Sequence, residues 1–241
     1  MTGKKLQEKE KRPEIITIDG PAGAGKSTVS KLLARRLQYM YLDTGAMYRA
    51  VALGLRQEGV DPEDEAALRK LCQKLKIAFQ GDSQNQRLIL NGKDVTEKIR
   101  EPEVGWIASK VSMKRPVREA LVDLQRKIGA GGKIVAEGRD TGTVVFPDAE
   151  HKFFLSAQLG ERARRRYREF AVKGVAINRG EVEKEMIRRD EQDSSRELAP
   201  LRPAPDALFI DSTKLNPEEV VAAILQAMGK GQGNKRKKLG R

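Results

Sequence analysis

Short strand-like runs and longer helix-like segments alternate along the chain. The run "EIITID" at 14–19 is apolar and β-branched, which is typical of a buried strand. After a glycine-rich turn, Val29, Leu32, Leu33 and Leu37 recur at helical spacing. Further strand-like runs lie at 39–43, 133–138, 151–157 and 207–212, and further helical patterns at 44–57, 116–128, 159–172, 180–192 and 216–228. The alternation predicts an α/β fold in which a five-stranded parallel sheet is covered by helices on both faces.

The region from about 62 to 104 interrupts this alternation. Its segments "LKIAFQ" and "RLILNGKDVT" predict two or three short strands joined by the polar turn "GDSQNQ". No helix of crossover length separates them, so these strands are expected to be antiparallel. The region therefore predicts a small insertion outside the main sheet.

Composition fits a globular enzyme with one main domain. The 241 residues are 39% hydrophobic and 34% charged, and no window of eighteen consecutive apolar residues occurs that could span a membrane. The N-terminal segment lacks the apolar stretch of a secretory signal, and Cys72 is the only cysteine, so no internal disulfide can form. These features predict a cytoplasmic protein.

The net charge of +13 raises the question of nucleic-acid binding, but its distribution is uneven. The last thirteen residues carry six Lys or Arg and no acid, and the first fourteen carry five basic residues against three Glu. These ends supply eight of the thirteen net charges. We expect 1–13 and 229–241 to be disordered basic tails that bind nucleic acid at most weakly.

The sequence "GPAGAGKST" at 20–28 matches the P-loop pattern in full and lies between a predicted strand and a predicted helix. In such a loop, backbone N–H groups and the helix N-terminus hold phosphates. We expect Lys26 to reach the β- and γ-phosphates and Ser27 to bind Mg²⁺. The residues expected to bind ATP here are Gly20, Gly23, Gly25, Lys26, Ser27 and Thr28.

Other P-loop proteins fit the sequence less well. The Asn-Lys-x-Asp that GTPases use to bind guanine is absent. Nucleic-acid motors are usually longer and have an apolar run that ends in an acid, for which "IVAEG" at 134–138 is the nearest candidate.

Arginines and carboxylates are grouped in short motifs elsewhere in the chain. A kinase that moves a phosphoryl group between two nucleotides must hold charge on donor, acceptor and transition state, and arginine forks with Mg²⁺ can do so without a nucleophilic side chain. The combination therefore predicts a nucleotide kinase. The residues concerned are Arg49, Arg118, the pair Arg139 and Asp140, the motif of Arg189, Asp193 and Arg196, and the helical pair Arg162 and Arg166.

Four motifs together, "IDGPAGAGKST", "LDTGAMYRAVA", "EGRDTGTVVFPDA" and "RDEQDSSRELAPL", resemble the bacterial cytidylate kinases, which are P-loop nucleoside monophosphate kinases. The resemblance covers 14–228. It implies a three-layer P-loop fold with strand order 2-3-1-4-5, in which the insertion at 62–104 binds the monophosphate and 158–178 forms a short lid. One departure is that some relatives have "DGRD" where this chain has "EGRD", but both place an acid before the glycine.

This resemblance implies Mg²⁺-dependent transfer of the γ-phosphoryl group of ATP to CMP or dCMP, a step of pyrimidine nucleotide metabolism, by a monomer. Cytosine presents an amino donor beside two acceptors, so a site that prefers it needs an acid and nearby donors. By similarity the acid is Asp140. The other residues implied for CMP are Ser109, Arg118 and Arg196 at the ring, Thr44 near the base, and Tyr48, Arg189 and Asp193 around the ribose.

The same resemblance assigns Arg49 and Arg139 to the acceptor phosphate, and Arg162 with Arg166 to a lid over ATP. Lys26, Arg139 and Arg189 are the residues expected to act in catalysis. No general base is expected, because the attacking phosphate oxygen is already ionised.

Several questions stay open at this point. Asp43 is expected either to organise Mg²⁺ waters or to cap the end of a strand, and His151, Trp106 and Cys72 are interpreted as structural. The acceptor could instead be UMP or a non-nucleotide. The basic tails could also indicate an ATP-dependent nucleic-acid-binding protein, or tether a kinase to RNA.

Overall fold

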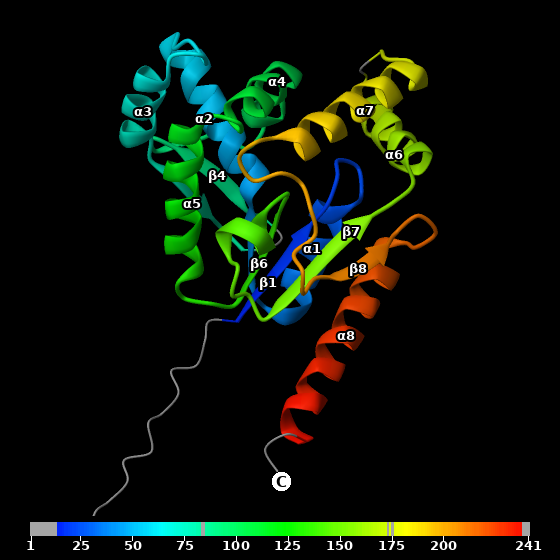
Figure 1. Cartoon of the computed structure of the whole chain (residues 1–241). Helices are drawn as coiled ribbons and strands as arrows, with labels where there is room; N and C mark the ends of the chain where they lie inside the picture. Colours follow the sequence, from blue (N-terminus) through cyan, green and yellow to red (C-terminus); the bar gives the residue numbers. More distant parts are fainter. Residues whose placement is uncertain (1–13, 83–84, 173, 175, 238–241) are drawn as a thin grey trace, which may run out of the picture.

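A five-stranded parallel sheet forms the centre of the molecule (Figure 1). The computed structural model describes residues 14–82, 85–172, 174 and 176–237, so the predicted N-terminal tail lies outside the described residues. The strands follow the order β2 (Met40–Asp43), β6 (Ile134–Gly138), β1 (Ile15–Asp19), β7 (His151–Ser156) and β8 (Leu208–Asp211). Numbered along the chain, the parallel strands have the order 2-3-1-4-5, which confirms the prediction.

Helices cover both faces of this sheet. On one face α1 (Lys26–Leu37) and α8 (Pro217–Lys237) pack against Ile16, Ile18 and Val135. On the other face α2 (Thr44–Glu58) and α5 (Arg115–Gly129) pack against the alternate residues of the same strands. Every residue of β1 and β6 is buried, as expected of strands in the middle of a doubly covered sheet.

The insertion contains a separate antiparallel sheet, as predicted. Its strands are β3 (Ile77–Gln80), β4 (Arg87–Leu90) and β5 (Lys93–Asp94). The 3₁₀ turn η1 (Lys98–Arg100) follows them.

Two helices of this region were not predicted, α3 (Glu65–Lys74) and α4 (Pro102–Val111). Both begin at recognisable signals, because Asp64 caps α3 by accepting the Ala67 N–H at 2.9 Å and Pro102 stands in the first turn of α4. Leu68 and Leu71 of α3 are buried and lie three residues apart, so the helix has one apolar face, but it is only ten residues long.

The helices α6 (Leu159–Val172) and α7 (Arg179–Ser195) pack on each other beside the cleft. Their shared core is small and consists of Ala163, Val182 and Met186, with partly buried neighbours. Asn178 begins α7 with a capping box that involves Glu181.

The last helix extends further than predicted. We expected α8 to end at 228 and a disordered tail to begin at 229, but the helix runs to Lys237. Adding a residue to an existing helix adds a hydrogen bond without a new nucleation cost, so a segment without proline can continue it. Residues 238–241 lie outside the described part of the chain.

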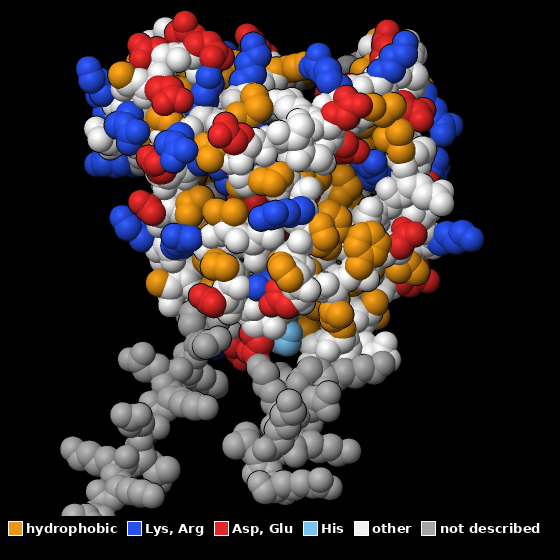
Figure 2. Space-filling model, in the orientation of Figure 1, with side chains coloured by type: hydrophobic (Ala, Val, Ile, Leu, Met, Phe, Trp, Pro, Cys, Tyr) orange, Lys and Arg blue, Asp and Glu red, His pale blue; other side chains and the backbone are white. Residues whose placement is uncertain are grey.

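The edge strand β8 exposes apolar side chains. Leu208 is 52% and Phe209 63% exposed, and the Phe209 ring stacks on Phe154 at 5.8 Å. Figure 2 shows hydrophobic side chains gathered over β7 and β8. Within the described residues, no helix combines the length and the apolar character that crossing a membrane requires.

Candidate active site

A cleft of about 890 Å³ lies at the carboxyl ends of the parallel strands, between the insertion and the pair α6 and α7. This is the edge at which ligands bind in open α/β sheets. Of the predicted site residues, the cleft is lined by Gly23, Gly25, Lys26, Ser27, Thr28, Thr44, Tyr48, Arg49, Arg118, Arg139, Asp140, Arg166, Arg189, Asp193 and Arg196. Segments that are distant in sequence thus meet around one space.

The P-loop has the backbone that its glycines allow. Gly25, the residue before α1, has a left-handed φ of 92°, which favours glycine. At Gly20 a Cβ atom would lie 1.9 Å from the carbonyl oxygen of Leu155, so a side chain there would collide with the neighbouring strand. The loop therefore leads directly into the N-terminus of α1, where backbone N–H groups face the cleft.

Lys26 is a buried cation at the centre of the cleft. Its Nζ donates to the carbonyl oxygen of Pro21 at 2.8 Å. Burial, followed by the charge of Arg139, lowers the pKa of Lys26 to about 7. The ammonium group therefore has little solvation of its own, and a phosphate beside it would restore the lost stabilisation.

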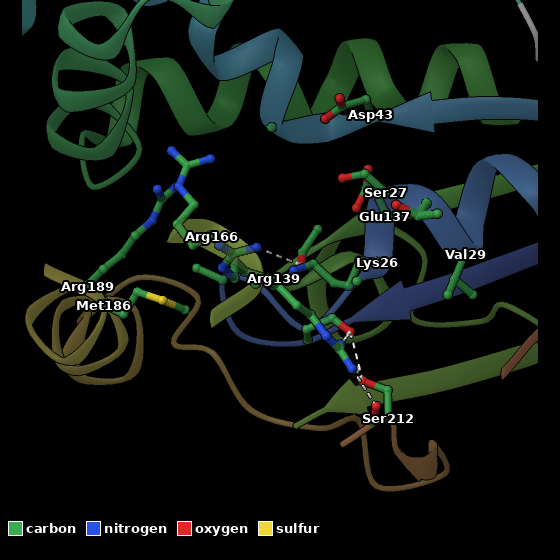
Figure 3. A pocket seen from close by; sticks show the side chains of 18 of the residues that line it. Lys26, Ser27, Val29, Asp43, Glu137, Arg139, Arg166, Met186, Arg189 and Ser212 are labelled. Carbon is green, nitrogen blue, oxygen red and sulfur yellow. Dashed lines mark hydrogen bonds between the residues drawn. The ribbon is translucent and has the colours of Figure 1, made fainter. Parts of the chain in front are cut away.

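Glu137 is a buried acid beside Lys26, and the sequence analysis gave it no role beyond the run "IVAEG". Burial, together with the nearby carboxylate of Asp43, raises the pKa of Glu137. The Tyr41 hydroxyl donates to its carboxylate. Figure 3 shows Ser27 and Glu137 side by side at the edge of the pocket.

Asp43 serves as the N-cap of α2. Its Oδ1 accepts the Ala46 N–H at 2.8 Å, and its Oδ2 pairs with Arg100 at 3.2 Å. This geometry supports the interpretation of Asp43 as a cap at the end of a strand. Asp43 nevertheless lines the cleft, within coulombic range of Glu137.

At the other end of the cleft, arginines are paired with buried carboxylates. Arg118 pairs with Asp140, and Arg139 donates to Asp193 at 2.7 Å. Arg196 lies 3.4 Å from the other oxygen of Asp193. These ion pairs fix the orientation of the arginines, since both members of each pair are largely buried.

Two further arginines at this end have no carboxylate partner among the described residues. Burial, followed by the positive charge of Arg100, lowers the pKa of Arg49 to about 10. Burial, followed by the positive charge of Arg139, lowers the pKa of Arg189 to about 10. Its Nε has no hydrogen-bond partner among the described residues. In Figure 3 the side chains of Arg166 and Arg189 extend toward the same space. A bound anion would relieve this accumulation of positive charge.

Thr44 and Tyr48 complete the wall on the side of α2. The Thr44 hydroxyl donates to the carbonyl oxygen of Glu137 at 2.7 Å, which joins α2 to β6. Burial raises the pKa of Tyr48, whose ring lies beside Arg118 and Asp140. Tyr48 therefore faces the cleft as a neutral phenol.

Three predicted site residues do not line the cleft, namely Gly20, Ser109 and Arg162. Arg162 is buried, donates to the carbonyl oxygens of Ala157 and Ala22, and pairs with Asp190 at 2.7 Å. It thus connects α6 and α7 to the P-loop. Its neighbour Arg165 does line the cleft, where it donates to Ser212.

Side chains of α4 contact those of α7, and both helices contribute residues to the cleft. The guanidinium of Arg188 lies 4.7 Å from the centre of the Trp106 ring. Ser109 donates to Gln192 at 3.2 Å. Trp106 is 48% exposed, so it packs at the surface against Arg188 and not in a core.

Asp19 is another residue that the sequence analysis missed. Its buried carboxylate accepts the backbone N–H groups of Thr141 and Gly142, at 2.9 and 2.7 Å, and the Thr141 hydroxyl at 2.7 Å. Asp19 thereby holds the π-helical turn η2 (Thr141–Val145), which follows directly after Asp140. The only available signal was an acid at the end of the strand before the P-loop.

Comparisons with known proteins agree with this geometry. The profile of the cytidylate kinase family matches residues 16–230. A cytidylate kinase of Citrifermentans bemidjiense is 53% identical over 86% of this chain and 89% of its own length. Those of Carboxydothermus hydrogenoformans and Thermotoga neapolitana are each 50% identical, over 89% and 88% of this chain and 97% and 94% of their own lengths. The chain therefore belongs to the cytidylate kinase family.

Proposed function

We propose that this cleft transfers the γ-phosphoryl group of ATP to CMP or dCMP, which gives ADP and CDP or dCDP. The observation that carries the proposal is that one continuous cleft has a P-loop at one end and a buried carboxylate among arginines at the other. The first end suits a nucleoside triphosphate, and the second suits a second phosphorylated ligand with an amino group.

At the donor end, Lys26 would bind the β- and γ-phosphates together with the loop N–H groups. The hydroxyl of Ser27 and the carboxylate of Glu137 are oxygen donors of the kind that Mg²⁺ prefers. Among the described residues no cluster of three or more His, Cys, Asp or Glu could hold a metal ion by itself. This arrangement fits Mg²⁺, which is bound largely through phosphates and water and which would neutralise charge on them.

The lid side would close over ATP with Arg165 and Arg166. We move the role first expected of Arg162 to Arg165, because Arg162 is engaged behind the P-loop. Closure would exclude water, which competes as an acceptor of the phosphoryl group.

At the acceptor end, Asp140 would accept a hydrogen bond from the cytosine amino group. Its partner Arg118 holds the carboxylate in place and is itself a donor for the ring, as is Arg196. Thr44 would approach the base, and Ser109 would join it after a small movement of α4. Uracil would place a carbonyl oxygen against the carboxylate, so UMP should be a poorer acceptor.

Arg49, Arg139 and Arg189 would bind the acceptor phosphate and the charge that develops during transfer. Tyr48 and Asp193 would contact the ribose of that nucleotide. The attacking oxygen is already ionised, so the transfer needs positioning and positive charge and no general base.

The insertion at 62–104 would bind the monophosphate, and 158–178 would act as the lid. We retain the monomer and the cytoplasmic location as parts of this proposal. Weak nucleic-acid binding by the terminal basic segments is a separate hypothesis that the cleft does not require.

The test is ADP formation from ATP and Mg²⁺ with CMP, dCMP, UMP, AMP, GMP or no acceptor. The proposal predicts fast turnover with CMP and dCMP only. Turnover that does not depend on an acceptor would contradict it. RNA-stimulated hydrolysis without transfer to CMP would favour an ATP-dependent nucleic-acid-binding protein.

A further inference from the structure

Tyr41 and Glu137 form a buried pair beneath the phosphate-binding loop. Tyr41 is 2% and Glu137 4% exposed, and the Tyr41 hydroxyl donates to Glu137 Oε1. Strand pairing places Tyr41 opposite Val135, two residues before Glu137. The two side chains therefore extend from the same face of the sheet, the face that α1 covers.

Glu137 connects this pair to the P-loop. Its carboxylate lies within coulombic range of Lys26, and Glu137, Ser27 and Lys26 all line the cleft. A carboxylate offers roughly four lone-pair sites, so one bond from Tyr41 orients the group and leaves the rest available. In Figure 3 the carboxylate of Glu137 lies next to Ser27.

The other acid in this corner of the cleft is held differently. Both oxygens of Asp43 are engaged, one by the Ala46 N–H and one by Arg100. Glu137 has no such backbone anchor among the described residues, and a single phenol supports it from below. The geometry thus separates an acid that caps a helix from an acid that is oriented toward the loop.

We propose that Tyr41 is a positioning residue whose hydroxyl holds the Glu137 carboxylate toward Ser27, where the cleft would take the Mg²⁺ of the bound nucleotide. This inference rests on the proposed function. Tyr41 itself touches no substrate and acts only through Glu137.

The test measures nucleotide binding rather than turnover. Calorimetry gives the affinity of ADP with and without Mg²⁺, and the ratio of the two affinities is the Mg²⁺ gain. Tyr41→Phe keeps the ring and removes only the hydroxyl. We expect its Mg²⁺ gain to fall about tenfold, because groups that hold a metal ligand in place typically change metal affinity about 10–100-fold when mutated. ADP affinity without Mg²⁺ should change little.

The matched control is Tyr39→Phe. Tyr39 is two residues away and also donates to a glutamate, Glu14, at 2.7 Å, but Glu14, unlike Glu137, does not line the cleft. In Tyr39→Phe the Mg²⁺ gain in ADP affinity should equal that of the wild-type protein. Glu137→Gln should lower the gain, and adding Tyr41→Phe to it should lower it no further, because both changes act on one group.

An unchanged Mg²⁺ gain in Tyr41→Phe, at a melting temperature close to wild type, would overturn the inference. So would an equal loss in Tyr39→Phe, or independent losses in the double variant. A wild-type protein that does not bind ADP would overturn the proposed function itself, and that result is distinguishable from the others.

Discussion

The two ends of the cleft are built to hold negative charge in different ways. The donor end uses one continuous segment, in which glycine backbone conformations and the start of α1 surround Lys26. The acceptor end uses side chains from α2, α5, α7 and the loop after β6, and most of its arginines are already paired with buried acids. We therefore expect the two ends to differ in how selective they are for their ligands. The donor end would serve any nucleoside triphosphate, whereas the acceptor end would select its ligand.

The largest expected effect is at the donor end. Lys26→Ala should lower kcat about 100–1000-fold with every acceptor, since it removes a charge that stabilises the transferring phosphoryl group. Steady-state kinetics with CMP and dCMP check this. Lys70→Ala, an exposed lysine of α3, is the control and should behave as wild type. Activity of Lys26→Ala within a few-fold of wild type would contradict the assignment.

A change at the acceptor end should alter selectivity instead. Asp140→Ala should reduce the ratio of kcat/KM for CMP over UMP by about 10–100-fold, because a hydrogen bond to a charged group is worth roughly 1.5–3 kcal/mol. Asp140→Asn should shift preference toward UMP further, since an amide can donate to the uracil oxygen. Equal losses on CMP and UMP would refute the role of Asp140 in recognising the base.

The unpaired arginines lead to a prediction about stability. Sulfate at constant ionic strength should raise the melting temperature above that in chloride, by about 5–10 °C if the sites fill. Arg189→Met should lose much of this gain. The lowered pKa of Arg189, about 10, means that its charge costs stability throughout neutral pH and is relieved only as the pH rises through 10.

The part of the sulfate gain that Arg189→Met removes should therefore stay constant between pH 6 and 8, whereas the part that depends on Lys26, whose pKa is about 7, should fall as the pH rises through 7. Scanning fluorimetry measures both. Identical melting temperatures in sulfate and chloride would show that the acceptor end does not bind anions.

The smallest expected effect lies outside both ends. Burial raises the pKa of Cys72 to about 11 from an ordinary 9.0, so at pH 8 its thiolate is about a hundredfold scarcer than that of an ordinary thiol. Labelling by a disulfide reagent should be slow, should accelerate as the pH rises toward 11, and should not respond to ATP or CMP. A rate equal to that of free cysteine would show that α3 opens readily.

The sequence was sufficient to predict the strand, loop and helix of the P-loop because that segment is local. The spacing from Gly20 to Ser27 and the flanking strand and helix are contiguous, so one stretch defines both the backbone and the charge. The order of the parallel sheet and the antiparallel nature of the insertion were also predicted and confirmed.

The residues that other elements bring to the P-loop could be identified only from the folded structure. Arg162 and Arg165 lie on the same helix, and the sequence does not show which of them faces the cleft. In the structure Arg162 packs against the P-loop and pairs with Asp190, whereas Arg165 lines the cleft. Glu137 and Asp19 were also missed as site residues, because an acid at a strand end has many uses until its neighbours are known. Helices α3 and α4 were missed because each is only ten residues long, so a helical period has few repeats in which to show.

The most direct test of the central claim is a competition experiment. Equimolar CMP, dCMP, UMP, AMP and GMP are incubated with limiting ATP, Mg²⁺ and the full chain, and the diphosphates are separated by chromatography. The account predicts that CDP and dCDP account for nearly all of the ATP consumed, and that this selectivity over UDP is lost in Asp140→Ala. Comparable amounts of CDP and UDP from the wild-type protein, or ADP without any matching diphosphate, would contradict it.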